Sequence, residues 1–240
     1  MKLSVYFSRM NSARAMYDNM PVDSIRVCVS VCNRKIGKAL NVSLPPVLSC
    51  PNCAGCMREC YDVRDCRYKN VLNARARNMS ILSRDMGKYF RDIIDAIKHH
   101  PSFRAFRWHV GGDVPPGASG AEYVRNMMDI ARMFPGVRFW TYTKNYRAYN
   151  EYVRTHGGSI ASAIPENMSV MFSEWRGIPM ENPYGFPEFK AYYDDELAPE
   201  GVMECTGDCR VCLATGRGCP HRESVWTRIR GQIKRAGRGK

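Results

Sequence analysis

Eight of the eleven cysteines in this sequence fall into two groups whose spacing is typical of metal ligands. The first group has the form C-x2-C-x2-C-x3-C and consists of Cys50, Cys53, Cys56 and Cys60. A short loop with this spacing can wrap an iron–sulfur cluster, because neighbouring thiolates reach different irons. Zinc bound by four cysteines is the main alternative. We therefore expect metal in this loop, with a [4Fe–4S] cluster preferred over zinc.

The second group lies near the C-terminus and consists of Cys205, Cys209, Cys212 and Cys219. Its C-x3-C-x2-C portion has the spacing of radical S-adenosylmethionine enzymes, but those enzymes carry it after their first strand. With Cys219 as a fourth ligand, a closed structural site for zinc or a cluster is the better interpretation. Cysteines of both groups could also share one site. Among the others, Cys66 could join a site, whereas Cys28 and Cys32 are expected to be buried.

The compartment follows from the lack of membrane and secretion signals. No apolar run approaches the roughly 18 residues that a membrane helix needs. The first residues, Met1-Lys2-Leu3, are charged too early for a signal peptide. We therefore expect a cytoplasmic protein without a membrane partner, whose thiols stay reduced and free to bind metal.

The charge is strongly positive, with 36 Lys and Arg against 23 Asp and Glu, for a net +13. Residues 221–240 alone hold seven Lys or Arg against one Glu, or 7 − 1 = +6. Such a tail attracts phosphate without reading sequence, so nucleic acid is an expected partner. A tail that only aids solubility is the equal alternative.

The central part of the chain alternates between strand-like and helix-like patterns. Strands are predicted near residues 103–110, 137–143 and 168–172, with helices near 72–82, 89–97, 123–131 and 146–154. Strands alternating with helices predict an α/β fold with a parallel sheet, either open or curved into a partial barrel. Such sheets place their chemistry at the carboxyl ends of the strands.

The two ends of the chain have weaker patterns. Residues 24–32 and 39–44 alternate in polarity around a turn, which predicts an N-terminal β-hairpin. We expect a single metal-binding domain over residues 1–220, with cysteine loops at 50–66 and 205–219, and a basic tail or helix over 221–240. Val225, Ile229 and Ile233 would line one face of that helix.

Three predicted strand ends carry polar residues that could form a pocket. His109 and Asp113 flank Gly111 and Gly112, and glycines allow a ligand to approach the backbone closely. Gly111-Gly112-Asp113 is similar to the Gly-Gly-Glu segment that receives S-adenosylmethionine in radical enzymes. Lys144 ends the next strand and could meet a carboxylate or phosphate. The third strand leads into Ser173-Glu174-Trp175-Arg176. An ordinary loop beside a buried histidine is the alternative interpretation.

Taken in order, these motifs resemble the bacteriophage family called gene product 88. The resemblance rests on Cys50-Pro51, Cys56, Cys60-Tyr61, Arg107-Trp108-His109, Gly112-Asp113, Phe139-Trp140-Thr141-Tyr142-Thr143-Lys144 and the closing pair Cys209 and Cys212. It covers roughly residues 25 to 220. It implies a phage or prophage origin and a metal-bearing core, and it implies no established activity.

We arrive at one leading hypothesis and two alternatives. The leading one is a phage-type iron–sulfur protein, with radical S-adenosylmethionine-like architecture and activity on or near nucleic acid. The first alternative is a nucleic-acid-binding protein that is held together by zinc or a cluster and is not an enzyme. The second is an electron carrier, which the basic excess and the lack of a ferredoxin-sized fold disfavour.

Overall fold

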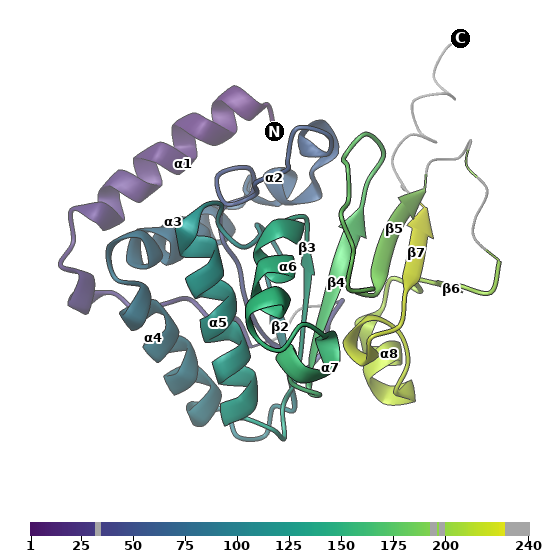
Figure 1. Ribbon diagram of the computed structural model, residues 1–240. Coiled ribbons are helices and arrows are strands. Elements are labelled where there is room, and N and C mark those ends of the chain that lie inside the picture. Colours follow the sequence, from purple (N-terminus) through teal and green to yellow (C-terminus); the bar gives the residue numbers. More distant parts are fainter. Residues whose placement is uncertain (32–34, 193–195, 197–199, 229–240) are drawn as a thin grey trace, which may run out of the picture.

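A computed structural model describes residues 1–31, 35–192, 196 and 200–228 of the chain. Its centre is an open, entirely parallel sheet of seven strands in the order β1-β2-β3-β4-β5-β7-β6 (Figure 1). The strands are β1 (Leu40–Val42), β2 (Ala105–Trp108), β3 (Arg138–Thr143), β4 (Met168–Glu174), β5 (Glu188–Tyr192), β6 (Met203–Glu204) and β7 (Val225–Arg228). The predicted α/β class and the open sheet are confirmed.

Most of the helices lie on one face of this sheet, where they connect successive strands (Figure 1). They are α3 (Lys69–Arg84), α4 (Met86–His99), α5 (Ala118–Met133), α6 (Tyr146–Thr155) and α7 (Ile160–Ala163). The shorter elements α2 (Tyr61–Asp65), α8 (Cys209–Thr215), η1 (Val22–Ser24), η2 (Met57–Glu59) and η3 (Cys219–His221) lie in the connections. None of the helices in the described part of the chain is both long and apolar enough to cross a membrane.

Alternate residues of the central strands point to opposite faces of the sheet. On β2, Phe106 and Trp108 are fully buried in the large core beneath α4 and α5. Their neighbours Ala105 and Arg107 therefore point to the other face, where Ala105 packs with Trp140 and Cys209 of α8. Strands β2, β3 and β4 are therefore buried on both faces over most of their length, which agrees with their many apolar residues.

The first residues form helix α1 (Leu3–Asp18), for which the sequence predicted no element. The helix packs on α3 through Tyr6, Met10 and Ala13, at the i, i+4, i+7 spacing of one helix face. Val5 and Met16 on other faces are 46% and 43% exposed. These exposed apolar residues obscure the amphipathic pattern in the sequence.

The N-terminal hairpin is not confirmed. One antiparallel bridge joins Ser30 to Asn41 within the described residues, and β1 pairs in parallel with β2 instead. Side chains of the helices take the backbone amides that a hairpin would have paired. Asp92 accepts from Val27 N at 3.0 Å and Asn78 accepts from Cys28 N at 2.7 Å.

The C-terminal segment also differs from expectation in its described part. Val225 begins strand β7 and does not lie on a helix, because it pairs with Phe189 of β5 and is buried beside Met171. The sheet therefore continues beyond residue 220, where the expected domain ended. Ile229 and Ile233 lie outside the described residues.

Asn78 holds the segment before β1 and the end of β1 against α3, and so positions the cysteine loop that follows. The side chain is 1% exposed and also donates to Cys28 O at 3.2 Å and to Ser43 O at 3.0 Å. We expect Asn78→Ala to lower the free energy of unfolding in urea by about 2 to 3 kcal/mol, because buried backbone groups lose their partners. Asn126→Ala, which removes an exposed bond to Glu122 O, should change it by less than about 0.5 kcal/mol. Equal effects of the two changes would contradict this role.

Candidate functional site

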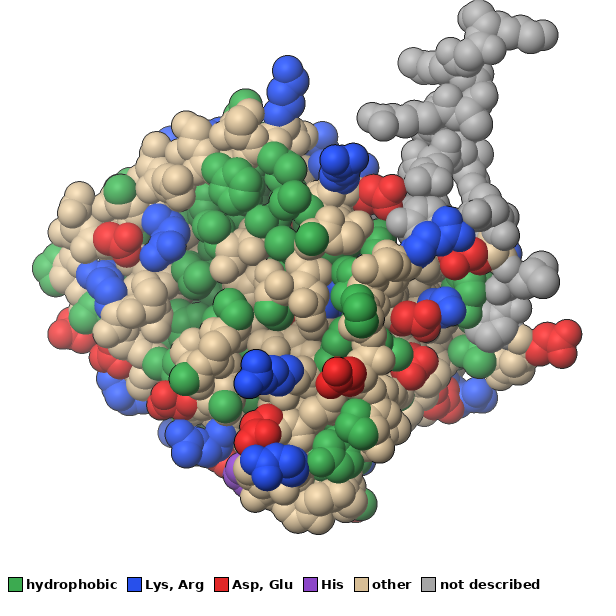
Figure 2. Space-filling view, turned by 45° about the horizontal axis from the view of Figure 1, so that its top comes forward, with side chains coloured by type: hydrophobic (Ala, Val, Ile, Leu, Met, Phe, Trp, Pro, Cys, Tyr) green, Lys and Arg blue, Asp and Glu red, His purple; other side chains and the backbone are tan. Residues whose placement is uncertain are grey.

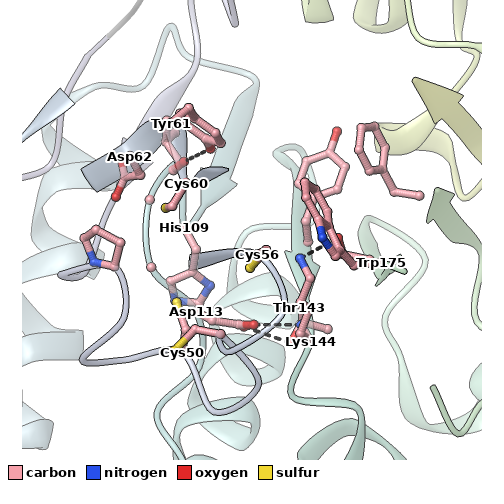
Figure 3. Close-up of a pocket in the computed structure, with 18 of the residues that line it drawn as sticks. Cys50, Cys56, Cys60, Tyr61, Asp62, His109, Asp113, Thr143, Lys144 and Trp175 are labelled. Carbon is pink, nitrogen blue, oxygen red and sulfur yellow. Dashed lines mark hydrogen bonds between the residues drawn. The ribbon is translucent and has the colours of Figure 1, made fainter. Parts of the chain in front are cut away.

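A cavity of about 230 Å³ lies at the carboxyl ends of the strands, beneath the loop that follows β1 (Figure 3). The three polar strand ends meet there as expected, with His109 after β2, Lys144 after β3 and Ser173 in β4 among the lining residues. Parallel pairing causes this convergence, because it brings the carboxyl ends of neighbouring strands to one edge.

All four cysteines of the first group line this cavity, and all are free thiols. In Figure 3 the sulfurs of Cys50 and Cys56 lie on the side of Asp113, and Cys60 lies farther along, beside Tyr61. Burial raises the pKa of the Cys50 thiol, and the Asp113 charge adds to this rise. Burial also raises the pKa values of Cys56 and Cys60. Cys50, Cys56 and Cys60 are therefore neutral thiols, which must lose protons to bind a metal.

Gly111 and Gly112 are both required by packing within the chain itself. A Cβ at Gly111 would overlap the Asp62 carboxylate. Gly112 has φ +78°, and a Cβ there would lie 2.6 Å from Leu44 O. The predicted glycine turn is thus present. The groups that lie close to its backbone belong to the chain itself, namely the Asp62 carboxylate and Leu44 O.

Asp113 is buried and ties the ends of two strands together. Its carboxylate accepts from Thr143 Oγ1 at 2.8 Å and from Lys144 N at 2.7 Å (Figure 3), and also from Val114 N at 2.7 Å. Burial outweighs these donors and raises the pKa of Asp113 to about 6. The side chain lines the cavity, and its principal partners are groups of the chain that it fixes in place.

His109 is a buried histidine whose ring nitrogens both have partners. Nδ1 is hydrogen-bonded to Thr141 Oγ1 at 3.3 Å and Nε2 to Tyr123 OH at 3.0 Å. Its backbone has φ +51°, which turns the chain from strand β2 into the glycine turn. Burial, with the nearby Arg107 charge, lowers the pKa of His109 to about 3, so the ring is neutral.

Lys144 crosses the cavity towards β4. Its ammonium donates to Ser173 Oγ at 3.0 Å and lies 5.3 Å from the centre of the Trp175 ring (Figure 3). Its backbone carbonyl accepts from Asn52 Nδ2 at 2.6 Å, which ties the cysteine loop to the end of β3. Lys144 is thus a cation that lines the cavity without a direct carboxylate bond in the described residues.

The second cysteine group lies on the sheet face opposite the large helices. Cys209, Cys212 and Cys219 are buried, and Cys205 and Cys209 also reach the lining of the cavity. Burial raises the pKa of Cys219 to about 12, and the charges of Cys205, Cys209 and Cys212 contribute to the rise. In the same way Cys56 contributes to the raised pKa of Cys60. Each group thus gathers its own cysteines, and the cavity touches both.

The thiols of the described residues do not converge on a common metal position. Within residues 1–31, 35–192, 196 and 200–228, no three His, Cys, Asp or Glu side chains form a group that could hold a metal. Cys66 is buried in the small core against which Cys60 also packs, and it accepts from Arg75 Nη1 at 3.1 Å. Cys28 is half-buried, not buried as expected, and lies in the segment held by Asn78. Cys32 lies outside the described residues.

Arg107 and Asp62 line the cavity as well, although the sequence did not single them out as site residues. Arg107 did give a signal, because it is a charged residue inside an otherwise apolar strand and is 7% exposed. Asp62 gave none, because its partner Arg75 lies thirteen residues away on α3.

The fold and the site define a parallel α/β protein with a cysteine-lined cavity at the carboxyl edge of its sheet. The family model described as Gene product 88 matches residues 21–177, and the chain belongs to this family. The match includes the first cysteine group and the three strand ends, but it stops before the second group, which the expected resemblance had included. No curated protein and no solved structure matches the chain.

The neutral state of His109 predicts a measurable loss of stability in acid. An unfolded chain protonates histidine near pH 6.5, whereas the folded ring does so near 3, so the unfolded state binds more protons in between. His109→Gln removes this titration and keeps polar groups for Thr141 and Tyr123. From about pH 7 to about pH 5, the variant should gain about 2 kcal/mol in free energy of unfolding relative to the parent protein. A difference that stays constant with pH would show that His109 is not buried in neutral form.

Proposed function

We propose that this Gene product 88 protein is an iron–sulfur protein that acts in the cytoplasm of the host cell of a phage. Cys50, Cys53, Cys56 and Cys60 would hold a [4Fe–4S] cluster at the carboxyl edge of the sheet. The observation that carries this proposal is that all four free thiols line one cavity together. Their spacing is that of a cluster-binding loop, and sulfur ligands suit both clusters and zinc.

Four cysteine thiols are suitable ligands for a [4Fe–4S] cluster, and two changes are required before they can bind one. The thiols must deprotonate against the effect of burial, which the metal charge makes favourable. Their side chains must also turn toward a common centre. A bound cluster would supply one-electron transfer, while the Asn52 bond to Lys144 O keeps the loop over the cavity.

The second group, Cys205, Cys209, Cys212 and Cys219, is proposed as a structural zinc or cluster site. It would fasten α8 and η3 to the sheet face opposite the large helices, where Ser169 Oγ donates to Cys219 O. Metal there would add stability by joining segments that have few apolar residues of their own.

The cavity beside the first group favours chemistry on a small molecule over simple electron carriage. An electron carrier requires only an enclosed cluster, whereas these four cysteines share a cavity with Lys144 and Trp175. Use of S-adenosylmethionine, as in radical enzymes, is the specific form of this proposal. In that case S-adenosylmethionine would bind beside Gly111, Gly112 and Asp113, whose close contacts and hydrogen bonds are already made within the chain.

Metal analysis tests the cluster. Protein purified without oxygen should be brown and hold iron and acid-labile sulfide in comparable amounts. Cys56→Ala combined with Cys60→Ala should remove one cluster, or about four irons per chain. Cys28→Ala is the matched control, because that thiol belongs to neither group, and it should leave iron unchanged.

Two outcomes would overturn the cluster proposal. The first is colourless protein that contains only zinc after anaerobic purification. The second is iron that persists at full content in the double variant. For the radical form, the reduced protein should change its EPR spectrum when S-adenosylmethionine is added and should release 5′-deoxyadenosine.

Nucleic-acid binding is a second candidate function, which the net charge of +13 favours. Figure 2 shows one face on which Lys and Arg side chains are spread among Asp and Glu and do not form a continuous basic patch. Attraction on that face would therefore be weak, which makes the basic residues 221–240 the better candidate.

Electrophoretic mobility shifts measured at several salt concentrations test this candidate. Neutralising Arg228, Arg230, Lys234 and Arg235 to Gln should weaken binding of DNA or RNA and flatten its dependence on salt, since fewer counterions are released. Neutralising four basic residues of helices, Arg91, Arg125, Arg147 and Arg154, gives a control with the same net charge. An equal loss in both variants would indicate that only overall charge matters.

A further inference from the structure

Arg107 is a buried cation in the cavity without a counter-ion among the described residues. It is 7% exposed, lies in the lining, and its Nε has no hydrogen-bond partner. Its guanidinium lies 4.8 Å from the centre of the Tyr142 ring, a cation–π contact that offsets part of the cost of burial. A buried charge without an opposite charge is destabilising, so this position would strongly stabilise an anion.

Arg75 shows how the same protein treats a buried arginine that has only a structural role. It is 6% exposed, like Arg107, but it forms an ion pair with Asp62 and donates to Cys66 Sγ at 3.1 Å. Its two terminal nitrogens therefore have partners within the chain, although its Nε, like that of Arg107, has none. The fork of Arg107 faces a cavity instead.

The acidic groups of the lining are engaged elsewhere. Asp62 forms its ion pair with Arg75, and the Arg107 charge acts on it only as a lesser influence that lowers its pKa. Asp113 accepts three bonds from Thr143, Lys144 N and Val114 N, and Glu59 is exposed. Lys144 adds a second cation to the same cavity. Lys35 also lines the cavity, so the lining contains three cationic side chains, of which Arg107 is the buried one.

Aromatic side chains line the cavity alongside the cysteines. Tyr61, Trp175 and Phe189 flank the cavity, and the Phe189 ring packs edge-on against Tyr142 at 5.0 Å. Such walls bury an apolar body, while a few polar groups fix its orientation. We propose that the cavity binds a small organic anion, whose carboxylate or phosphate pairs with Arg107 and whose apolar or aromatic part packs against Trp175 and Phe189. This proposal holds for either metal in the cysteine groups and for neither.

Calorimetric titration of the protein as purified tests the site with four probes. These are inorganic phosphate, phenyl phosphate, acetate and benzoate. We expect saturable binding of at least one aromatic probe, and tighter binding of that probe than of its bare anion, because the ring gains apolar contacts. The phosphate and carboxylate pairs show which head group Arg107 prefers.

Three variants assign the binding to Arg107. Arg107→Met keeps the length of the side chain without its charge and should weaken binding at least about tenfold, because the charged hydrogen bonds are lost. Arg107→Lys keeps a charge but loses the planar fork, so its affinity should lie between the two. Arg154→Gln, which removes an exposed arginine paired with Glu151, is the control and should bind like the parent.

Thermal unfolding without any probe separates ligand binding from a structural role. Arg107→Met should unfold at the same or a higher temperature than the parent, because it removes an uncompensated buried charge. A marked fall in unfolding temperature, or unchanged probe affinity in Arg107→Met, would overturn the proposal. So would loss of bound metal in Arg107→Met with probe affinity retained, which would make Arg107 a counter-ion of Cys209 and Cys219 instead.

Discussion

The carboxylate of Asp113 joins the ends of β2 and β3, and much of the site is arranged around this one buried group. It fixes Thr143 and the Lys144 backbone through bonds of 2.8 and 2.7 Å. Lys144 in turn receives Asn52 from the cysteine loop. Burial disfavours the charged form of Asp113. The three surrounding hydrogen-bond donors offset part of this cost and hold the carboxylate in position. The position of the first cysteine group relative to the sheet thus depends on a hydrogen-bonded chain of contacts that starts at Asp113.

The two buried arginines show that the protein compensates charge selectively. Arg75 and Asp62 form a buried ion pair next to Gly111, and the absence of a side chain at Gly111 makes room for it. This pair fastens α2 to α3 below the cysteine loop. Arg107 has the face of Tyr142, and it lines the cavity to which both cysteine groups contribute. A protein that pairs one buried cation this tightly leaves the other available to something from outside the chain.

Local periodicity was sufficient to predict most of the central fold. Strands near 105–108, 138–143 and 168–174 and the helices between them follow from alternation and from i, i+3, i+4 spacing. The predicted N-terminal hairpin is not confirmed. Two of the backbone amides that it would have paired donate to Asn78 and Asp92, which lie 50 and 65 residues away. Helix α1 could not be predicted from periodicity, because exposed apolar residues such as Val5 interrupt the polar face that would mark an amphipathic helix.

The sequence by itself determined the chemistry on offer, namely two sets of closely spaced thiols and three polar strand ends in a parallel α/β chain. Spacing along the chain is a local property, so it can be read without a structure. Only the tertiary structure decided how these groups are used. The first cysteines line the cavity, and Asp113 binds the ends of the strands through hydrogen bonds. Arg107 is buried without an ion pair to a described carboxylate, and its Nε has no hydrogen-bond partner. Burial and pairing depend on residues far apart in sequence, and the parallel sheet alone brings them to one edge.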